Sequence, residues 1–341
     1  MQKSKKVRIH DVAAMAGVSV GSASRVLNRA TNVSPDIRAR VEAAMAALGY
    51  QPSHAARVLR SRSSMTIGCL FSDVSNPLYA RAFRALEESF RRDGYMLLLA
   101  SGLGDVQREM EMLRTFSLRG MDGVIYAPSH EKHPQLIELV DSLGMPVVLY
   151  DRDLAARADA VLFDHATGIR EACQRLFALG HTRIALALWD ASSRPVRKRI
   201  QGYKAAYRER GMEPPPLILK QPTATSSVFE DLQRLLAGPQ APTALNAQGT
   251  QMLVTGLGAI TRTGRRIPQD FSVVGIGDSD FAQSHDPAIT VLRTDPDEVA
   301  ACVKAMLLDR LAGHGPAGNR RATVPYELVS RESWGPAGKG R

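Results

Sequence analysis

The chain has 341 residues, 44% of them hydrophobic, and a formal net charge of +10, so it can form a small domain followed by one or two larger ones. No apolar run is long enough to span a membrane, and the charged N-terminus lacks a signal-peptide pattern, which predicts a soluble cytoplasmic protein. Cys69, Cys173 and Cys302 are isolated and fit no metal-ligand spacing. We therefore expect reduced, buried cysteines, no metal site and no cofactor.

The first feature along the chain, residues 9–28, has the pattern of two short helices joined by a tight turn. Gly17 is expected to end the first helix, and Ser19 is a favourable N-cap for the second. Apolar residues recur three and four apart on each side of the turn, at Val12, Ala13, Ala16, Ala23, Val26 and Leu27. A helix-turn-helix places the start of its second helix in the DNA major groove. The residues expected to face the bases and phosphates are Val20, Gly21, Ser22 and Arg25.

A third helix follows and should close over the first two. Ser34-Pro35-Asp36 combines an N-cap, a proline at the first helical position and an acid at the helix N-terminus. The helix has one apolar side and is expected to end at Gly49. The next segment, 50–63, is too polar to form a stable helix alone.

Positive charge is concentrated in the same segment. Residues 1–64 hold eleven Lys or Arg and three acids, a net of +8, so the other 277 residues are nearly balanced. Such a basic module is typical of phosphate binding, with an affinity that falls steeply with salt. The stretch Lys3–Lys6 has no pattern and is equally well explained as a solvated basic arm.

From Met65 onward, short apolar strands alternate with amphipathic helices, which predicts parallel sheets with helices on both faces. We expect strands at 65–71, 95–100, 123–127, 147–150, 183–188, 217–220, 243–246, 272–276, 290–292 and 322–328. Helices are expected at 79–92, 106–118, 136–143, 167–179, 196–209, 228–236, 251–263 and 297–311. Two successive sets of similar size suggest two α/β lobes with a cleft between them.

The N-terminal motifs resemble the headpiece of the lactose-repressor (LacI) family of bacterial transcription regulators. The matching stretches are DVAAMAGVSV, SRVLN, VSPDIRARVEAAMAALGY and QPSHAARVL. The resemblance implies a hinge helix that folds on the operator and a leucine, here Leu59, that wedges into the minor groove. The DNA-contacting set it implies is Ser19, Val20, Gly21, Ser22, Arg25, Asn28, Arg29, Ser34, His54, Ala56, Arg57 and Leu59.

The resemblance extends along the core through IGCLFSDVSNPLYARAFRALEE, LRGMDGVIYAP, MPVVLYDRD, LFALGHTRIALA and RRIPQDFSVVGIGD. It implies a periplasmic-binding-protein-like core of two doubly wound parallel sheets, with three crossings between the lobes. The expected division is a headpiece over 1–50, a hinge over 51–64, a first lobe over 65–161 plus about 293–321, a second lobe over 162–292 plus about 322–331, and a flexible tail over 332–341.

Ligands of such cores bind in the cleft at the carboxyl ends of the strands. The resemblance places Ser72, Asp73, Tyr79, Asp151, Arg199 and Asp278 there. Three of them have another explanation: Asp73 could cap the following helix, Asp151 could form a surface pair with Arg152, and Arg199 lies in a basic run that could be solvated.

Three positions depart from the family pattern. Gly249-Thr250 replaces an Asn-Asp pair at the mouth of the cleft, and Gly277-Asp278 replaces a pair of acids, as in some gluconate-type members. These changes favour a sugar acid such as gluconate over a neutral hexose. Gly21 stands where a larger base-reading side chain is usual, which shifts direct readout toward Ser22, Arg25 and Leu59.

Enzymatic motifs are incomplete. Gly256-Leu257-Gly258 lacks the third glycine of a dinucleotide fingerprint, and His130-Glu131-Lys132-His133 is one residue short of a zinc-protease motif. We expect a non-enzymatic, homodimeric repressor that binds a pseudo-palindromic double-stranded DNA operator and responds to a sugar-like effector. The alternative is a soluble sugar-binding or sugar-modifying α/β protein that does not act on DNA.

Overall fold

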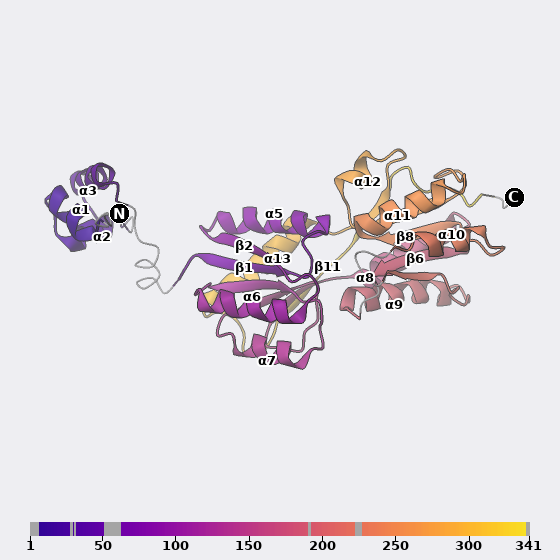
Figure 1. The fold of residues 1–341 in the computed structure, drawn as a ribbon, viewed down its shortest axis with the longest axis horizontal. Coiled ribbons are helices and arrows are strands. Elements are labelled where there is room, and N and C mark those ends of the chain that lie inside the picture. The colour runs from indigo at the N-terminus through magenta and orange to yellow at the C-terminus, as the bar shows by residue number, and fades with distance from the viewer. Residues whose placement is uncertain are drawn as a thin grey trace, which may run out of the picture. The chain divides into compact units, whose positions relative to one another are not determined.

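A computed structural model describes residues 7–27, 30, 32–50, 63–189, 192–221 and 227–338. The chain divides into two compact units, Met1–Ser64 and Met65–Arg341 (Figure 1). Each has its own hydrophobic core. Within the described ranges, no helix combines the length and the apolar composition needed to cross a membrane.

The N-terminal unit is a three-helix headpiece, as expected. It contains α1 (Ile9–Ala16), α2 (Val20–Leu27) and α3 (Pro35–Leu48). The Ser19 hydroxyl accepts a hydrogen bond from the Ser22 amide at 3.1 Å at the start of α2, and Ser34 accepts one from the Ile37 amide at the start of α3. Among its described residues, the buried hydrophobic ones are Val12, Ala13, Ala16, Ala23, Val26, Val41 and Ala44.

The first lobe of the larger unit is a six-stranded parallel sheet. Its strand order is β11 (Arg321–Val324), β5 (Asp159–Phe163), β4 (Val147–Tyr150), β3 (Gly123–Ala127), β1 (Thr66–Phe71) and β2 (Met96–Ser101). Two helices, α5 (Pro77–Arg91) and α13 (Pro296–Leu311), cover one face of the sheet. Two others, α6 (Val106–Leu118) and α7 (Pro134–Ser142), cover the opposite face (Figure 1).

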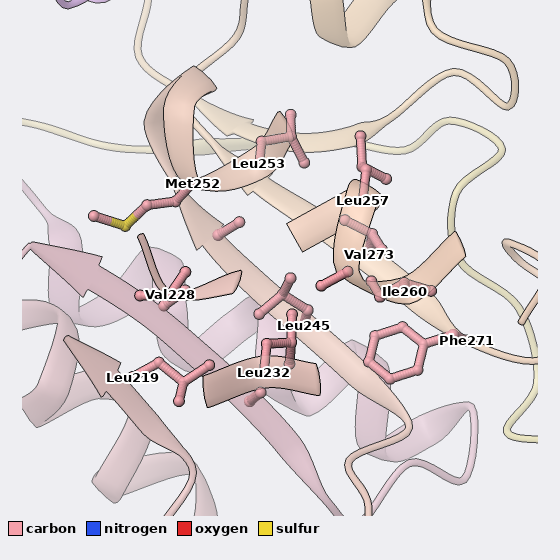
Figure 2. Close-up of a cluster of buried hydrophobic side chains, with 14 of the residues drawn as sticks. Leu219, Val228, Leu232, Leu245, Met252, Leu253, Leu257, Ile260, Phe271 and Val273 are labelled. Carbon is pink, nitrogen blue, oxygen red and sulfur yellow. The ribbon is translucent and has the colours of Figure 1, made fainter. Parts of the chain in front are cut away.

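The second lobe repeats this arrangement. Its strand order is β12 (Glu327–Val329), β10 (Thr290–Arg293), β9 (Ser272–Ile276), β8 (Ala244–Gln248), β6 (Ile184–Trp189) and β7 (Ile218–Gln221), with β12 antiparallel to β10. One face packs against α8 (His165–Ala178) and α9 (Arg194–Arg208). The other packs against α10 (Phe229–Ala237), α11 (Gly249–Thr261) and the short α12 (Asp280–Ser284), and Figure 2 shows the leucine-rich core beneath α10 and α11.

The chain passes between the lobes three times: from β5 to α8, from β10 to α13 and from β11 to β12. The second crossing brings α13 back onto the first lobe, where Val299, Val303 and Leu307 are buried against its sheet. These three crossings connect the two lobes. The predicted two-lobed α/β core is therefore present.

Several sequence expectations need correction. The single strand expected over 322–328 is two strands, β11 in the first sheet and β12 in the second, because Pro325 lies between them and lacks the N–H that a continuous ladder needs. Val324 therefore still belongs to the first sheet, although we expected the second lobe to begin at about residue 322. The strand β5 was not predicted, and the expected lobe boundary at residue 161 falls inside it.

The described part of the C-terminal segment is not a flexible tail. The Ser333 hydroxyl donates to the Val273 carbonyl at 2.6 Å and accepts from the Thr290 amide at 2.8 Å. Farther along, the Ala337 amide donates to the Leu179 carbonyl. Side-chain and backbone hydrogen bonds thus fasten the segment to the second lobe, which the glycine-rich composition did not indicate.

Candidate functional site

The start of α2 forms a polar, accessible surface on the headpiece. Ser19, Val20, Gly21 and Arg25 are exposed and Ser22 is half-buried. The Ser19 and Ser22 hydroxyls lie 3.0 Å apart. Small polar groups beside a guanidinium can donate to phosphates and to base edges, so this helix end has the chemistry of a DNA-reading surface.

Arginine side chains hold the headpiece together as well as giving it charge. Arg40 donates to the Ala16 carbonyl at 2.6 Å and to the Gly17 carbonyl at 2.9 Å, which fixes the turn between α1 and α2. Arg38 donates to the Ala30 carbonyl at 2.7 Å. Two of the basic residues counted in the sequence are therefore engaged within the fold.

The predicted DNA contacts are only partly within the described residues. Ser34, also in the predicted set, is exposed and caps α3. Asn28, Arg29, His54, Ala56, Arg57 and Leu59 lie outside the described residues.

The larger unit contains a cavity of about 880 Å³ between the two lobes. Residues from both lobes line it, at the ends of β1, β4, β6, β8 and β9 and at the starts of α5 and α9. All six residues predicted from the resemblance lie on its wall: Ser72, Asp73, Tyr79, Asp151, Arg199 and Asp278. The volume falls within the usual range for small-molecule sites.

An aromatic and polar wall comes from the first lobe. The Tyr79 ring stacks on Phe71 with centroids 4.7 Å apart, and its hydroxyl lies 3.0 Å from the Ser72 hydroxyl and accepts from Arg152 at 2.9 Å. Asp73 accepts from the Ser75 amide, whereas Asn76 caps α5. Asp73 is therefore not the cap of the following helix.

Asp151 is buried, so it is not part of a surface pair. Its carboxylate lies 2.8 Å from His165 Nε2 and accepts from the Phe163 amide at 3.1 Å, and Arg194 lies 3.5 Å away. Burial alone would raise the pKa of Asp151, but His165 and the nearby guanidinium groups hold it below its usual value. The carboxylate is ionised and already has several donors.

His165 connects Asp151 to Tyr326, which lies between β11 and β12. Burial lowers the pKa of His165 to about 4, so its ring is neutral at pH 7. Because Nε2 donates to Asp151, Nδ1 must accept, and the Tyr326 hydroxyl lies 3.1 Å from it. Burial raises the pKa of Tyr326 to about 12, and nearby Arg199 opposes that rise. A series of hydrogen-bonded side chains, Asp151–His165–Tyr326, therefore runs from the first lobe across two of the crossings toward Arg199.

Asp278 lies on the cavity wall but is heavily hydrogen-bonded. Arg331 donates to both of its carboxylate oxygens, at 3.0 and 2.8 Å, and the Ser279 amide and Gln283 donate as well. Burial opposes ionisation, yet Arg331 lowers the pKa of Asp278 below its usual value. The carboxylate has little remaining capacity to accept from a ligand.

Arg199 is the opposite case. It is 7% exposed, projects from α9 and lines the cavity. Its Nε and Nη1 have no hydrogen-bond partner among the described residues. A buried guanidinium with unused donors is costly unless another group completes its hydrogen bonds, so Arg199 is poised for an anionic or hydroxyl-bearing ligand.

Comparisons with known proteins match both units. Residues 8–53 match the model described as bacterial regulatory proteins, lacI family, and residues 173–334 match a periplasmic binding protein-like domain. The HTH-type transcriptional regulator DegA of Bacillus subtilis (strain 168) is 31% identical, with 97% of this chain and 99% of DegA covered. The chain belongs to the lacI family.

This lacI-family chain is similar to further regulators along most of its length. The ribose operon repressor of Escherichia coli (strain K12) is 31% identical over 88% of this chain and 92% of its own length. The Lac repressor dimer bound to operator and the anti-inducer ONPF has a TM-score of 0.84 at 27% identity, covering 96% of this chain and 99% of that one. A transcriptional regulator CelR–cellobiose complex has a TM-score of 0.72 at 28% identity, with 96% and 99% covered. The protein is thus a DNA-binding transcriptional regulator.

Sequence reasoning missed several residues of the regulator's cavity. Trp189 ends β6 and lines the cavity, and Tyr326 lines it from the third crossing. Arg331, which neutralises Asp278, lies 53 positions away in the sequence. The Trp189 ring at the end of an apolar strand was a usable signal. Tyr326 lies within the segment whose two strands had been treated as one, and Arg331 follows that segment.

Proposed function

We propose that this lacI-family regulator is a homodimeric repressor whose operator affinity is controlled by a sugar-like effector in the inter-lobe cavity, and that the effector carries an acid group. The observation that carries the proposal is Arg199, a buried guanidinium facing the cavity with unused donors. The named relatives include a ribose operon repressor and a structure with cellobiose, which supports a carbohydrate-like ligand.

The acid group follows from the charge balance of the cavity. Asp151 and Asp278 already accept from His165 and Arg331, so they offer little to the hydroxyls of a neutral sugar. Arg199 instead has unused donors for a carboxylate. We therefore favour a sugar acid, without restricting it to gluconate.

On DNA, we assign the base-reading surface to Ser19, Val20, Gly21, Ser22 and Arg25, with Ser34 close to a phosphate. Asn28, Arg29, His54, Ala56, Arg57 and Leu59 complete the proposed contacts from outside the described residues. A two-fold dimer would place two such surfaces on a pseudo-palindromic operator.

The first lobe offers a surface for that dimer. The strand β2 lies at the edge of its sheet and exposes Met96, Leu98 and Leu99, with Leu103 following. Exposed edge strands with apolar side chains tend to be covered by another chain. We assign this surface, the β2 edge, to the contact with a second copy.

Thermal-shift titrations with matched pairs, such as D-gluconate with D-glucose and D-galacturonate with D-galactose, test the effector proposal. An acid should raise the melting temperature more than its neutral partner. Arg199→Met should remove the difference, because it deletes the guanidinium and keeps much of the side-chain volume. Arg208→Met, on the exposed side of the same helix, is the matched control. Stabilisation by neutral sugars alone, or an unchanged acid response in Arg199→Met, would contradict the proposal.

A further inference from the structure

The N-terminus of α9, the helix that carries Arg199, is capped by a residue of the other lobe. The adjacent N-cap residue, Ser193, is buried but forms no side-chain cap. Instead, Glu131 Oε2, in the loop between β3 and α7 of the first lobe, accepts from the Arg194 amide at 2.7 Å. A carboxylate at this position satisfies an unpaired helix donor and interacts favourably with the helix dipole.

Glu131 forms two further interactions. Its Oε2 accepts from Arg197 Nη1 at 3.0 Å, and its Oε1 accepts from the Asp153 amide at 3.1 Å. The Glu131 side chain is 2% exposed. Two donors therefore come from the second lobe and one from the first, so a buried carboxylate spans the boundary between the lobes.

The first turn of α9 also contacts the first lobe through the side chain of Arg194. That guanidinium donates to the Phe163 carbonyl at 3.0 Å and lies 3.5 Å from Asp151. The lobes also meet at a second place, where Arg81 of α5 contacts Asp280 and a Cβ at Gly277 would overlap the Leu78 side chain. We refer to the Glu131–α9 contact as the clasp and to the contacts of Leu78 and Arg81 with residues 277–280 as the opposite contact.

We propose that Glu131 is a positioning residue that holds the two lobes in this arrangement and, by docking α9 on the first lobe, positions Arg199 in the cavity. The clasp breaks when the lobes part, since its donors lie on both sides of the boundary. Lobe closure and presentation of the ligand-binding arginine are thus coupled through one carboxylate. The regulatory consequence rests on the proposed function, because an effector that bridges the lobes would favour the arrangement the clasp stabilises.

Hydrogen–deuterium exchange of the full-length protein, without DNA or effector, tests the clasp. Both carboxylate oxygens of Glu131 accept hydrogen bonds, and Glu131→Gln replaces one of them with an NH2 group, which can only donate. In one orientation the NH2 group faces the Asp153 amide, and in the other it faces the Arg194 amide and Arg197, so at least one hydrogen bond is lost either way. We expect exchange at Arg194 and Asp153 to become about tenfold faster, with faster exchange also at 277–283 and unchanged exchange in β1. Glu138→Gln, exposed on the neighbouring α7, is the matched control and should change none of these.

The pattern of exchange decides the outcome. Unchanged protection at Arg194, or faster exchange at Arg194 and Asp153 alone, would overturn the proposal, because a clasp must also loosen the opposite contact. If exchange rises everywhere, including β1, Glu131→Gln has destabilised the whole fold and a second variant, Arg197→Gln, decides instead. Arg197→Gln removes the ion pair with Glu131 but leaves the Glu131 carboxylate in contact with the Arg194 amide. Acceleration limited to the clasp and the opposite contact would support the proposal, and no acceleration would overturn it. Failure of operator or effector binding would leave this result unaffected.

Discussion

At the scale of single residues, the charged groups of the cavity differ in how much of their hydrogen-bonding capacity is already used. Asp151 and Asp278 are ionised because guanidinium and imidazole groups donate to them within the protein. Arg199 is buried to a similar extent but keeps two nitrogens without a partner in the described structure. Because these groups are buried, it matters whether each charge has hydrogen-bond partners: an uncompensated charge in a low-dielectric site costs several kcal/mol of stability. The unused donors therefore carry more information about the ligand than the more numerous acids.

His165 gives the first prediction, a dependence of stability on pH. Its pKa is about 4 in the folded protein and near 6.5 when exposed, so its contribution is complete above pH 6.5 and is lost as pH falls from 6.5 to 4. Urea unfolding between pH 7.5 and 4.5 should show His165→Asn with a shallower loss than the native chain. The difference is at most about 1.4 kcal/mol per pH unit, the value for one proton.

The exposed His314 provides the control for that measurement. His314→Asn should follow the native pH dependence, because the His314 ring lies on the surface and its replacement alters no buried group. Equal slopes for His165→Asn and the native protein would show that the His165 ring takes up its proton as readily in the folded chain as in the unfolded one.

At the scale of elements, replacing two glycines of the headpiece by alanine should change its stability in opposite directions. A Cβ at Gly21, within α2, would meet only Ser19 Oγ at 3.7 Å, so Gly21→Ala should stabilise the headpiece by about 0.5–1 kcal/mol. Gly17 has a φ of 59°, and its Cβ would lie 2.7 Å from the Arg40 guanidinium, so Gly17→Ala should destabilise it by about 1–2 kcal/mol. Amide exchange in α1 and α2 measures both changes. A destabilising Gly21→Ala would show that the start of α2 is under a constraint other than helix propensity.

Local patterns predicted most elements of this fold because caps and apolar periodicity are encoded within a few residues. Ser34-Pro35-Asp36 opens α3, and the run at 272–276 forms β9 with the predicted bounds. The errors arose where partners are distant in sequence. Pro325 separates strands of different sheets, and the edge strand β11 takes its register from β5.

In the candidate site, too, the features encoded in local motifs were predicted and those that depend on distant partners were not. The resemblance located Arg199 and Tyr79 on the cavity wall, because they stand within local motifs. It could not reveal that His165 and Arg331 already occupy the carboxylates of Asp151 and Asp278, since those contacts depend on how the crossings pack. Nor could it indicate Glu131, whose partners belong to the other lobe. Motifs therefore identified candidates, and packing determined their hydrogen-bonding state.

At the scale of the whole molecule, dimerisation through the β2 edge gives the last prediction. Leu98 and Leu99 are 39% and 42% exposed on an edge strand that, within the described part of the chain, pairs with β1 alone. Leu99→Asp would appear twice in a two-fold interface, and burying one leucine contributes about 1.5–3 kcal/mol. The dimer dissociation constant should rise at least about 100-fold, which sedimentation equilibrium measures directly. Specific operator affinity should fall with it, because one headpiece reads only one half-site.

Leu118→Asp is the control for general effects of an added acid. Leu118 is 88% exposed at the end of α6, so this substitution should leave the dimer intact. Thermal shifts with the acid ligand should persist in Leu99→Asp, because the cavity lies within one chain. If Leu99→Asp still forms a dimer with the native dissociation constant, the β2 edge is not part of the dimer interface. A variant that becomes monomeric yet binds a full operator with native affinity would instead separate operator recognition from the two-fold pairing of headpieces.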